Sequence, residues 1–234
     1  MKDQKIKQDL VHAYKICAML KVDDLTYTHI TARPQNAQYF YILAFGNMFD
    51  QASINNLIKV DIASGQVVEG DEAIYNKTGY TIHSAIYKKR DDINAIFHLH
   101  TTNSIAVSAM ECGLLFISQF SMPFFEDISY HNYNSLALKD SVHGGAIADD
   151  LGQNKNMLMR GHGTINCGKD LQEAFFYTRF LQQACDVQVA ALSSGKKIIT
   201  IDPTICKKAK HDMLNFEKNL GERDWKALTK NFTT

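Results

Sequence analysis

The chain has 234 residues, of which 45% are hydrophobic and 21% charged, as in ordinary globular proteins. This composition excludes a disordered tail, a collagen-like fibre and a long coiled coil. The 25 basic and 25 acidic side chains cancel, so the basic excess typical of nucleic-acid-binding proteins is missing and we expect no nucleic-acid partner. No stretch approaches 18 uninterrupted apolar residues, which argues against a membrane span. Five scattered cysteines without a paired motif indicate reduced thiols, and hence a cytoplasmic protein.

The first half of the chain alternates helical and strand-like patterns. Apolar residues at helical spacing predict an amphipathic helix near the N-terminus, and short β-branched or aromatic runs predict strands. The expected elements are a helix at 4–20, strands at 38–42 and 57–61, a strand–turn–strand at 61–68, a helix at 78–89 and a strand at 93–100.

The second half continues the same alternation. We expect a helix from residue 101 or 102 to 111, strands at 157–160 and 164–167, a long helix from Asp170 to Ser194, and a last helix near Pro203. Asp170 is a good N-cap, and Glu173 three residues later resembles a capping box. Alternating helices and short strands favour a three-layer α/β domain with a mixed or antiparallel sheet. We assign residues 1–200 to this domain and 201–234 to a helical extension of it.

The strongest chemical signal is the pair His98 and His100 at the end of an apolar strand. Side chains alternate along a strand, so both rings point to the same face, about 7 Å apart. Two such imidazoles can converge on one cation. Taken alone, the pair is equally compatible with two ordinary histidines on a sheet.

A third ligand is available at His162, which lies between two glycines at a strand–turn–strand junction. Alone it would read as an exposed histidine in a hairpin turn. Combined with the pair, it gives three neutral imidazoles, and three such ligands with an open position are typical of a catalytic divalent metal.

Two further segments are candidates for ligand binding. His29 lies in the polar run 27–33, which fits either a polar strand edge or a substrate-binding loop. Lys77 and Thr78 precede a helix, where backbone N–H groups and a lysine can bind an anion. The alternative is a capped helix with a solvated lysine.

These pieces resemble the class II aldolase/adducin family, and within it the adducin-like branch. The order and spacing of the matching motifs cover roughly residues 5–195. They are YTHITAR at 27–33, FGNMFD at 45–50, NKTGYTIHS at 76–84, HLHT at 98–101, MRGHG at 159–163, EA at 173–174 and VQVA at 187–190.

The resemblance implies an α/β/α fold, usually a ring-shaped homotetramer with active sites at subunit junctions. The three zinc-binding histidines of the family's sugar-phosphate aldolases carry over onto His98, His100 and His162. The metal would act as a Lewis acid that stabilises an enediolate while a carbon–carbon bond breaks. We expect zinc, although imidazole also suits manganese, iron and cobalt.

The sequence departs from the aldolase pattern at the acid/base position, where Gly79 replaces a glutamate. Glycine cannot move a proton, so we consider His29 and Glu126 as catalytic replacements. The family's phosphate-binding serines fall near Lys77 and Thr78, which suggests a pocket rebuilt for another anion.

We assign five residues to substrate binding: Thr31, Arg33, Gly46, Lys77 and Thr78. The favoured function is a metal-dependent aldolase or decarboxylase that cleaves a small, anionic, hydroxylated carbonyl or carboxylate. The alternative is a non-catalytic, adducin-like module that binds actin, although the long basic tail of animal adducins is not seen here.

Overall fold

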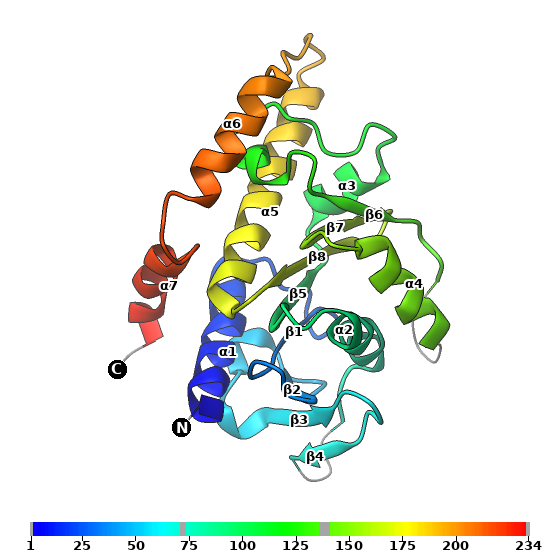
Figure 1. Ribbon diagram of the computed structural model, residues 1–234, viewed down its shortest axis with the longest axis vertical. Helices are drawn as coiled ribbons and strands as arrows, with labels where there is room; N and C mark the ends of the chain where they lie inside the picture. Colours follow the sequence, from blue (N-terminus) through cyan, green and yellow to red (C-terminus); the bar gives the residue numbers. More distant parts are fainter. Residues whose placement is uncertain (1, 71–73, 136–140, 233–234) are drawn as a thin grey trace.

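The computed structural model describes residues 2–70, 74–135 and 141–232, and within them the centre is an eight-stranded sheet (Figure 1). Neighbouring strands are antiparallel, except that β6 and β7 are parallel. The spatial order is β4 (Val67–Glu69), β3 (Leu57–Asp61), β2 (Tyr39–Leu43), β1 (His29–Ala32), β5 (Ala95–Leu99), β8 (Gly163–Gly168), β7 (Asn156–Met159) and β6 (Ser129–His131). The expected mixed sheet is confirmed.

Helices cover both faces of this sheet, which confirms the three-layer α/β/α architecture. One apolar core joins α1 and the start of α5 to β1, β2 and β5, and a second joins α2 and α4 to the opposite face. The helices are α1 (Lys2–Met19), α2 (Lys77–Lys89), α3 (Thr102–Ala109), α4 (Ser141–Leu151) and α5 (Leu171–Ser193). Helix α4 and strand β6 come from a region for which the sequence predicted no element.

The two central helices begin at recognisable caps. The Asn76 side chain accepts hydrogen bonds from the N–H groups of Thr78 and Gly79 at the start of α2. Asp170 accepts from the Glu173 N–H at 2.9 Å and begins α5 as predicted. The Glu173 carboxylate accepts from the Lys169 N–H, so this capping box reaches one residue further back than the standard one.

The C-terminal residues form two helices that pack beside α5 (Figure 1). Helix α6 (Pro203–Leu214) contacts the 3-10 helix η3 (Gln119–Phe124). In α7 (Glu222–Thr229), the Trp225 ring packs on Phe175 of α5 with centroids 5.9 Å apart. The remaining 3-10 helices are η1 (Phe49–Gln51), η2 (Ile54–Asn56) and η4 (Lys230–Phe232). Within the described residues, the helices are too short or too polar to cross a bilayer.

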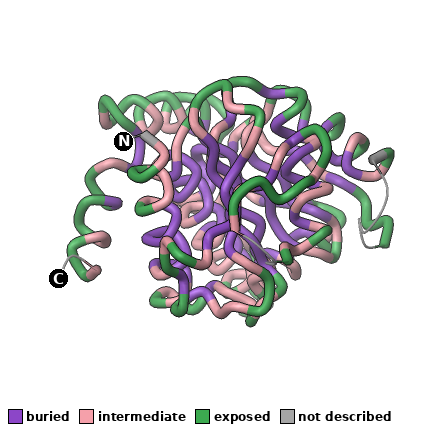
Figure 2. Tube along the Cα trace, turned by 90° about the horizontal axis from the view of Figure 1, so that it is seen from below, coloured by how far each residue is buried: buried purple, intermediate pink, exposed green. Residues whose placement is uncertain are grey.

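Strand β1 is polar in sequence yet completely buried, in the interior that Figure 2 shows in purple. It is neither a sheet edge nor a loop, because it lies between β2 and β5. Its polar side chains, His29 and Thr31, both hydrogen-bond to His83 of α2, which makes their burial tolerable. The register pairs His29 with His98 and so brings two sequence motifs together.

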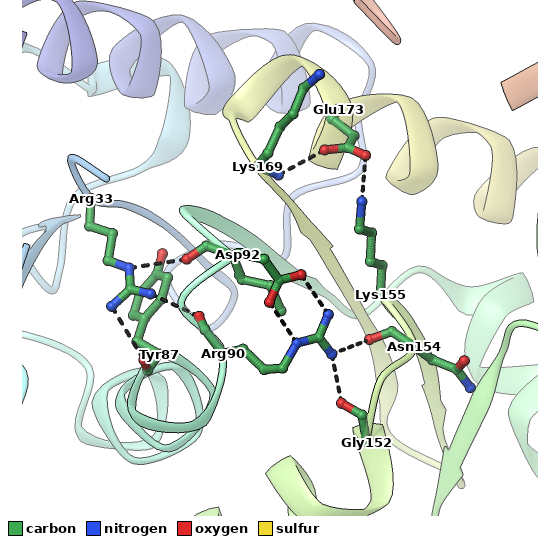
Figure 3. A network of polar contacts seen from close by, with 10 residues as sticks. Arg33, Tyr87, Arg90, Asp92, Gly152, Asn154, Lys155, Lys169 and Glu173 are labelled. Atoms are coloured by element: carbon green, nitrogen blue, oxygen red, sulfur yellow. Dashed lines mark hydrogen bonds and ion pairs between the residues drawn. The ribbon is translucent and has the colours of Figure 1, made fainter. Parts of the chain in front are cut away.

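The far end of β1 is fixed by two arginines (Figure 3). Arg33 donates to the carbonyls of Ile93 (3.0 Å) and Arg90 (2.8 Å) and lies on the Tyr87 ring. Arg90 in turn donates to the Asp92 carboxylate and to carbonyls of the turn after α4. These bonds lock β1, α2 and α4 together at the end opposite the histidines.

Candidate metal centre

Three histidines from distant parts of the chain converge at one end of the sheet. His98 lies in β5, His100 follows its end, and His162 lies in the turn between β7 and β8. Their possible ligand atoms all lie within 4.8 Å of one another. The ring centroids are 4.7 Å apart for the 98–100 pair and 4.9 Å for each pair with His162. A Cβ at Gly163 would collide with the Leu99 carbonyl and the His100 ring, so glycine is what lets this turn approach β5.

Hydrogen bonds to Nδ1 fix the orientation of two of these rings, those of His98 and His100. His98 Nδ1 lies 2.9 Å from the Thr164 carbonyl and His100 Nδ1 lies 3.1 Å from the Asp24 carboxylate. Both partners only accept, so each Nδ1 carries the proton and each Nε2 keeps a lone pair. The two Nε2 atoms are 2.9 Å apart. Two facing lone pairs repel, whereas a shared cation satisfies both, so the donor set fits a divalent metal.

Burial keeps His98 and His162 in their uncharged, metal-binding form. Desolvation is the main cause that holds the pKa of His98 well below its usual value, and neighbouring histidines add to it. Desolvation first, and the nearby His100 second, lower the pKa of His162 to about 4. These two rings are uncharged at neutral pH, so one nitrogen of each has a free lone pair and can bind a cation without first losing a proton.

His29 lies directly behind the cluster and belongs to a buried chain of hydrogen bonds. Its ring stacks on His98 with centroids 4.8 Å apart. His29 Nδ1 is 3.0 Å from His83 Nε2, and His83 Nδ1 is 2.7 Å from Thr31 Oγ1. Thr31 Oγ1 is also 2.8 Å from the Tyr87 hydroxyl. The chain therefore connects β1 to α2 beneath the metal centre.

The direction of this chain follows from its end. Within the described part of the molecule, the Tyr87 hydroxyl has Thr31 Oγ1 as its only hydrogen-bond partner, and we assign Tyr87 as the donor of this bond, an assignment that sets the tautomers further along the chain. Thr31 then donates to His83, and His83 donates to His29 Nδ1. Burial is the main cause that lowers the pKa of both histidines, so each ring has one proton, and that of His29 is on Nε2.

Gly79 and His29 form one structural unit. A Cβ at position 79 would lie 2.9 Å from the Cγ and Cδ2 atoms of the His29 ring. Any side chain there would displace the imidazole. In other family members we expect a glutamate at this position. Here the residue is glycine, and the His29 ring fills the space next to it.

Two of the expected substrate-binding residues lie near the cluster. Gly46 lines a small cavity together with His29, Thr28 and Asn76. Thr28 is buried, and its hydroxyl has no partner in the described residues. The Thr78 hydroxyl donates to the Asn76 side chain at 2.6 Å, so it caps the helix that borders this cavity.

The other expected site residues lie elsewhere or serve the packing. Lys77 is exposed and lines a separate cavity on the outer side of α2. Thr31 belongs to the buried chain, and Arg33 donates to carbonyls at the opposite end of β1. Glu126 is exposed in a turn beside α6, where its two neighbours contact Lys210. Its catalytic role stays a prediction.

The sequence interpretation missed several contributors. Asp24, which orients His100, is 76 residues away from it in a loop, and no local pattern indicates that contact. Asn76 had a readable signal, because asparagine directly before a helix is a favoured N-cap. Thr28 lies inside the run 27–33 but was not assigned a role.

The chain belongs to the class II aldolase and adducin family. The family model described as the Class II Aldolase and Adducin N-terminal domain matches residues 8–189. A Pseudomonas aeruginosa protein named as an aldolase class 2 protein is 36% identical over 94% of this chain and 86% of its own length. Mouse alpha-adducin is 33% identical over 86% of this chain, but only 28% of the adducin is covered. The structure of L-fuculose 1-phosphate aldolase from Glaciozyma antarctica superposes with a TM-score of 0.84 at 27% identity, covering 97% of this chain and 89% of that one.

Proposed function

We propose that the protein is a metal-dependent lyase, an aldolase or decarboxylase, that cleaves a carbon–carbon bond of a small hydroxylated carbonyl or carboxylate. The observation that carries this proposal is the convergence of three imidazoles: His98 Nε2 and His100 Nε2 lie 2.9 Å apart, and His162 lies beside them with all ligand atoms within 4.8 Å. These three residues would hold a divalent cation, with zinc preferred over manganese, iron or cobalt. When bound, the cation would supply Lewis acidity toward adjacent carbonyl and hydroxyl oxygens of the substrate.

His29 is the residue to which we assign the hydrogen bond that a glutamate would otherwise supply. Its ring is neutral and its proton is on Nε2, so it donates a hydrogen bond rather than acting as a strong acid. We infer that it holds a substrate oxygen or the water that exchanges the substrate proton, and that solvent supplies the proton itself.

The cavity next to His29 is the place where we put the anionic end of the substrate. The unpartnered Thr28 hydroxyl, Gly46 and the α2 cap residue Asn76 line it, so the N-terminus of α2 begins at its wall; we place the Lys77 side chain at the entrance to the site, as a proposal. A helix N-terminus and a lysine both favour an anion. We also expect the family's tetramer, which sedimentation of the purified protein at several concentrations tests.

The experiment is a metal-dependent exchange assay that needs no knowledge of the full substrate. Purified protein is analysed for metal, stripped with a chelator and reloaded with zinc or cobalt. Each form is incubated in deuterated water with dihydroxyacetone phosphate, dihydroxyacetone, glycolaldehyde or pyruvate. We expect one stoichiometric metal per chain and exchange of the proton next to the carbonyl only in the loaded forms. A protein that takes up no metal, or a loaded protein that exchanges none of these protons, contradicts the proposal.

The identity to alpha-adducin supports a second candidate, a binding module without chemistry. The chain spans about a quarter of that relative, so the adducin's own partners do not transfer with it. Co-sedimentation with actin filaments at low salt separates the two functions. We expect the protein to stay in the supernatant, and stoichiometric pelleting with filaments would favour the binding module.

A further inference from the structure

A second small cavity lies on the other side of His162, away from His29. It is lined by side chains of β6, α4 and α2 and by His162 itself, with room for about one water-sized group. Its polar members include His131, His143 and Tyr133, and its apolar wall is formed by Ile82, Ile147 and Met159. None of these residues is part of the function proposed above except His162.

Strand β6 places His131 beside the turn that carries His162. β6 pairs in parallel with β7, with His131 opposite Met159, and the His131 carbonyl accepts from the Arg160 N–H at 2.8 Å. The turn from Arg160 to His162 therefore begins directly next to His131.

The His131 ring is held in one orientation by a carboxylate. Its Nδ1 lies 2.7 Å from Asp150 Oδ2, a partner that only accepts, so Nδ1 donates, and a ring with one proton then has its lone pair on Nε2. The residue is 6% exposed, and Nε2 is buried without a hydrogen-bond partner among the described residues. A buried acceptor left unpaired is costly, and in native structures such an atom calls for a ligand or water.

Helix α4 supplies the support for this arrangement. His143, Ile147 and Asp150 are spaced by four and three residues, so they lie on one face of the helix. The His143 and His131 ring centroids are 5.8 Å apart. A Cβ at Gly144 would lie 2.5 Å from the Thr81 carbonyl of α2, so glycine permits the close contact that seats α4 here.

We propose that this cavity is a subsite for one hydroxyl group of the substrate, with His131 Nε2 accepting its hydrogen bond. This rests on the proposed function, because His162 belongs both to the metal centre and to the cavity lining and is what links the two. An acceptor nitrogen selects a hydroxyl over a carboxylate, because two acceptors facing each other repel. The cavity therefore favours a substrate with a hydroxylated carbon chain beyond the atoms that meet the metal.

The test compares hydroxamates, which chelate a metal through two adjacent oxygens, on the cobalt-loaded protein. Acetohydroxamate has no hydroxyl on its chain, glycolohydroxamate has one and glycerohydroxamate has two. Malonohydroxamate ends in a carboxylate. The visible spectrum of cobalt gives each dissociation constant. We expect a hydroxylated probe to bind about tenfold more tightly than acetohydroxamate, as one buried hydrogen bond provides, and malonohydroxamate to gain nothing.

Variants test whether the tighter binding of the hydroxylated probe depends on His131. In His131→Leu the gain from the hydroxyl disappears, and in His131→Gln, which keeps an acceptor, part of it returns. Ser129→Ala is the matched control, because Ser129 also joins β6 to the end of α4, through the Leu151 carbonyl, but does not line the cavity. It keeps the full gain. All variants bind cobalt as the wild type does.

The outcomes separate the two proposals. If acetohydroxamate does not change the cobalt spectrum of the wild type, the proposed function fails. If it binds but the hydroxyl gain is absent, or equal in His131→Leu, or if the carboxylate probe binds best, the subsite is overturned. Should His131→Leu not fold, the ¹⁵N resonance of His131 Nε2 in the wild type decides: it shifts when glycerohydroxamate is added, and an unchanged resonance refutes the subsite.

Discussion

Two histidine–aspartate pairs in this molecule share one design and differ in what they face. His100 is held by Asp24 and His131 by Asp150, in each case through Nδ1, and the two carboxylate side chains are 43% and 48% exposed. His100 Nε2 meets His98 Nε2, whereas His131 Nε2 meets no partner in the described residues. The same orienting bond thus prepares one ring for a cation shared with other rings and the other ring for a ligand that brings its own proton.

The largest expected effect comes from removing one of the three imidazoles of the metal centre. His98→Ala deletes one of three ligands, so we expect the affinity for zinc or cobalt to fall by more than about 100-fold, beyond the loss typical for an orienting partner. Competition with a colorimetric chelator measures it, and circular dichroism checks the fold. His131→Gln is the control and retains the wild-type affinity. Equal metal binding in His98→Ala would show that the cluster is not the metal site.

Replacing the two carboxylates that orient His100 and His131 should have smaller effects, and only one of the two replacements should weaken metal binding. Asp24→Asn weakens the acceptor that fixes the His100 ring, and we expect about 10- to 100-fold weaker metal binding. Asp150→Asn, the same change at the matching pair, leaves metal affinity as it is. Both are measured by the same chelator competition. If both variants lost affinity equally, the two pairs would not have separate tasks.

A substitution at Gly79 tests how firmly the His29 ring is held behind the three-histidine cluster. Gly79→Ala forces a methyl group against His29 and should lower the free energy of unfolding by about 1–3 kcal/mol. Gly145→Ala is the matched control, since no atom lies within 4 Å of its added Cβ, and alanine in a helix should raise stability by about 0.5–1 kcal/mol. Urea denaturation measures both. A neutral Gly79→Ala would mean that His29 moves away freely.

Acidification should destabilise the metal-free protein gradually. Burial lowers the pKa of His162 to about 4 from an ordinary value of 6.5. Between these values the unfolded chain binds a proton that the folded chain does not, so stability falls as the pH drops from about 6.5 toward 4. The urea midpoint of chelator-treated protein at several pH values measures this, and His162→Gln should flatten the slope. A midpoint that rises on acidification would contradict neutral, buried rings.

Local patterns in the sequence predict the helices and strands of this fold, and with them the site residues that those elements carry. Strand alternation placed His98 and His100 on one face, and the cap at Asp170 began the long helix where expected. The run 27–33 was harder, because its buried residues His29 and Thr31 are satisfied by His83 and Tyr87 of α2, which are distant in the sequence. Contacts such as those of Asp24 and Asp150 depend on loops and on α4, whose residues show no clear periodicity. Which histidine each of these two aspartates contacts is set by the tertiary structure, so it could not be predicted from local sequence patterns.

The glycine contact between α4 and α2 has a consequence for divergence within the family. A Cβ at Gly144 would collide with the Thr81 backbone, so a larger residue there would push α4 away from α2 and change the space beside His131. Under the proposed function, the choice of substrate could then change through a helix that holds none of the three metal-binding histidines. Descendants of such a scaffold can acquire new preferences through one helix while the reaction stays the same.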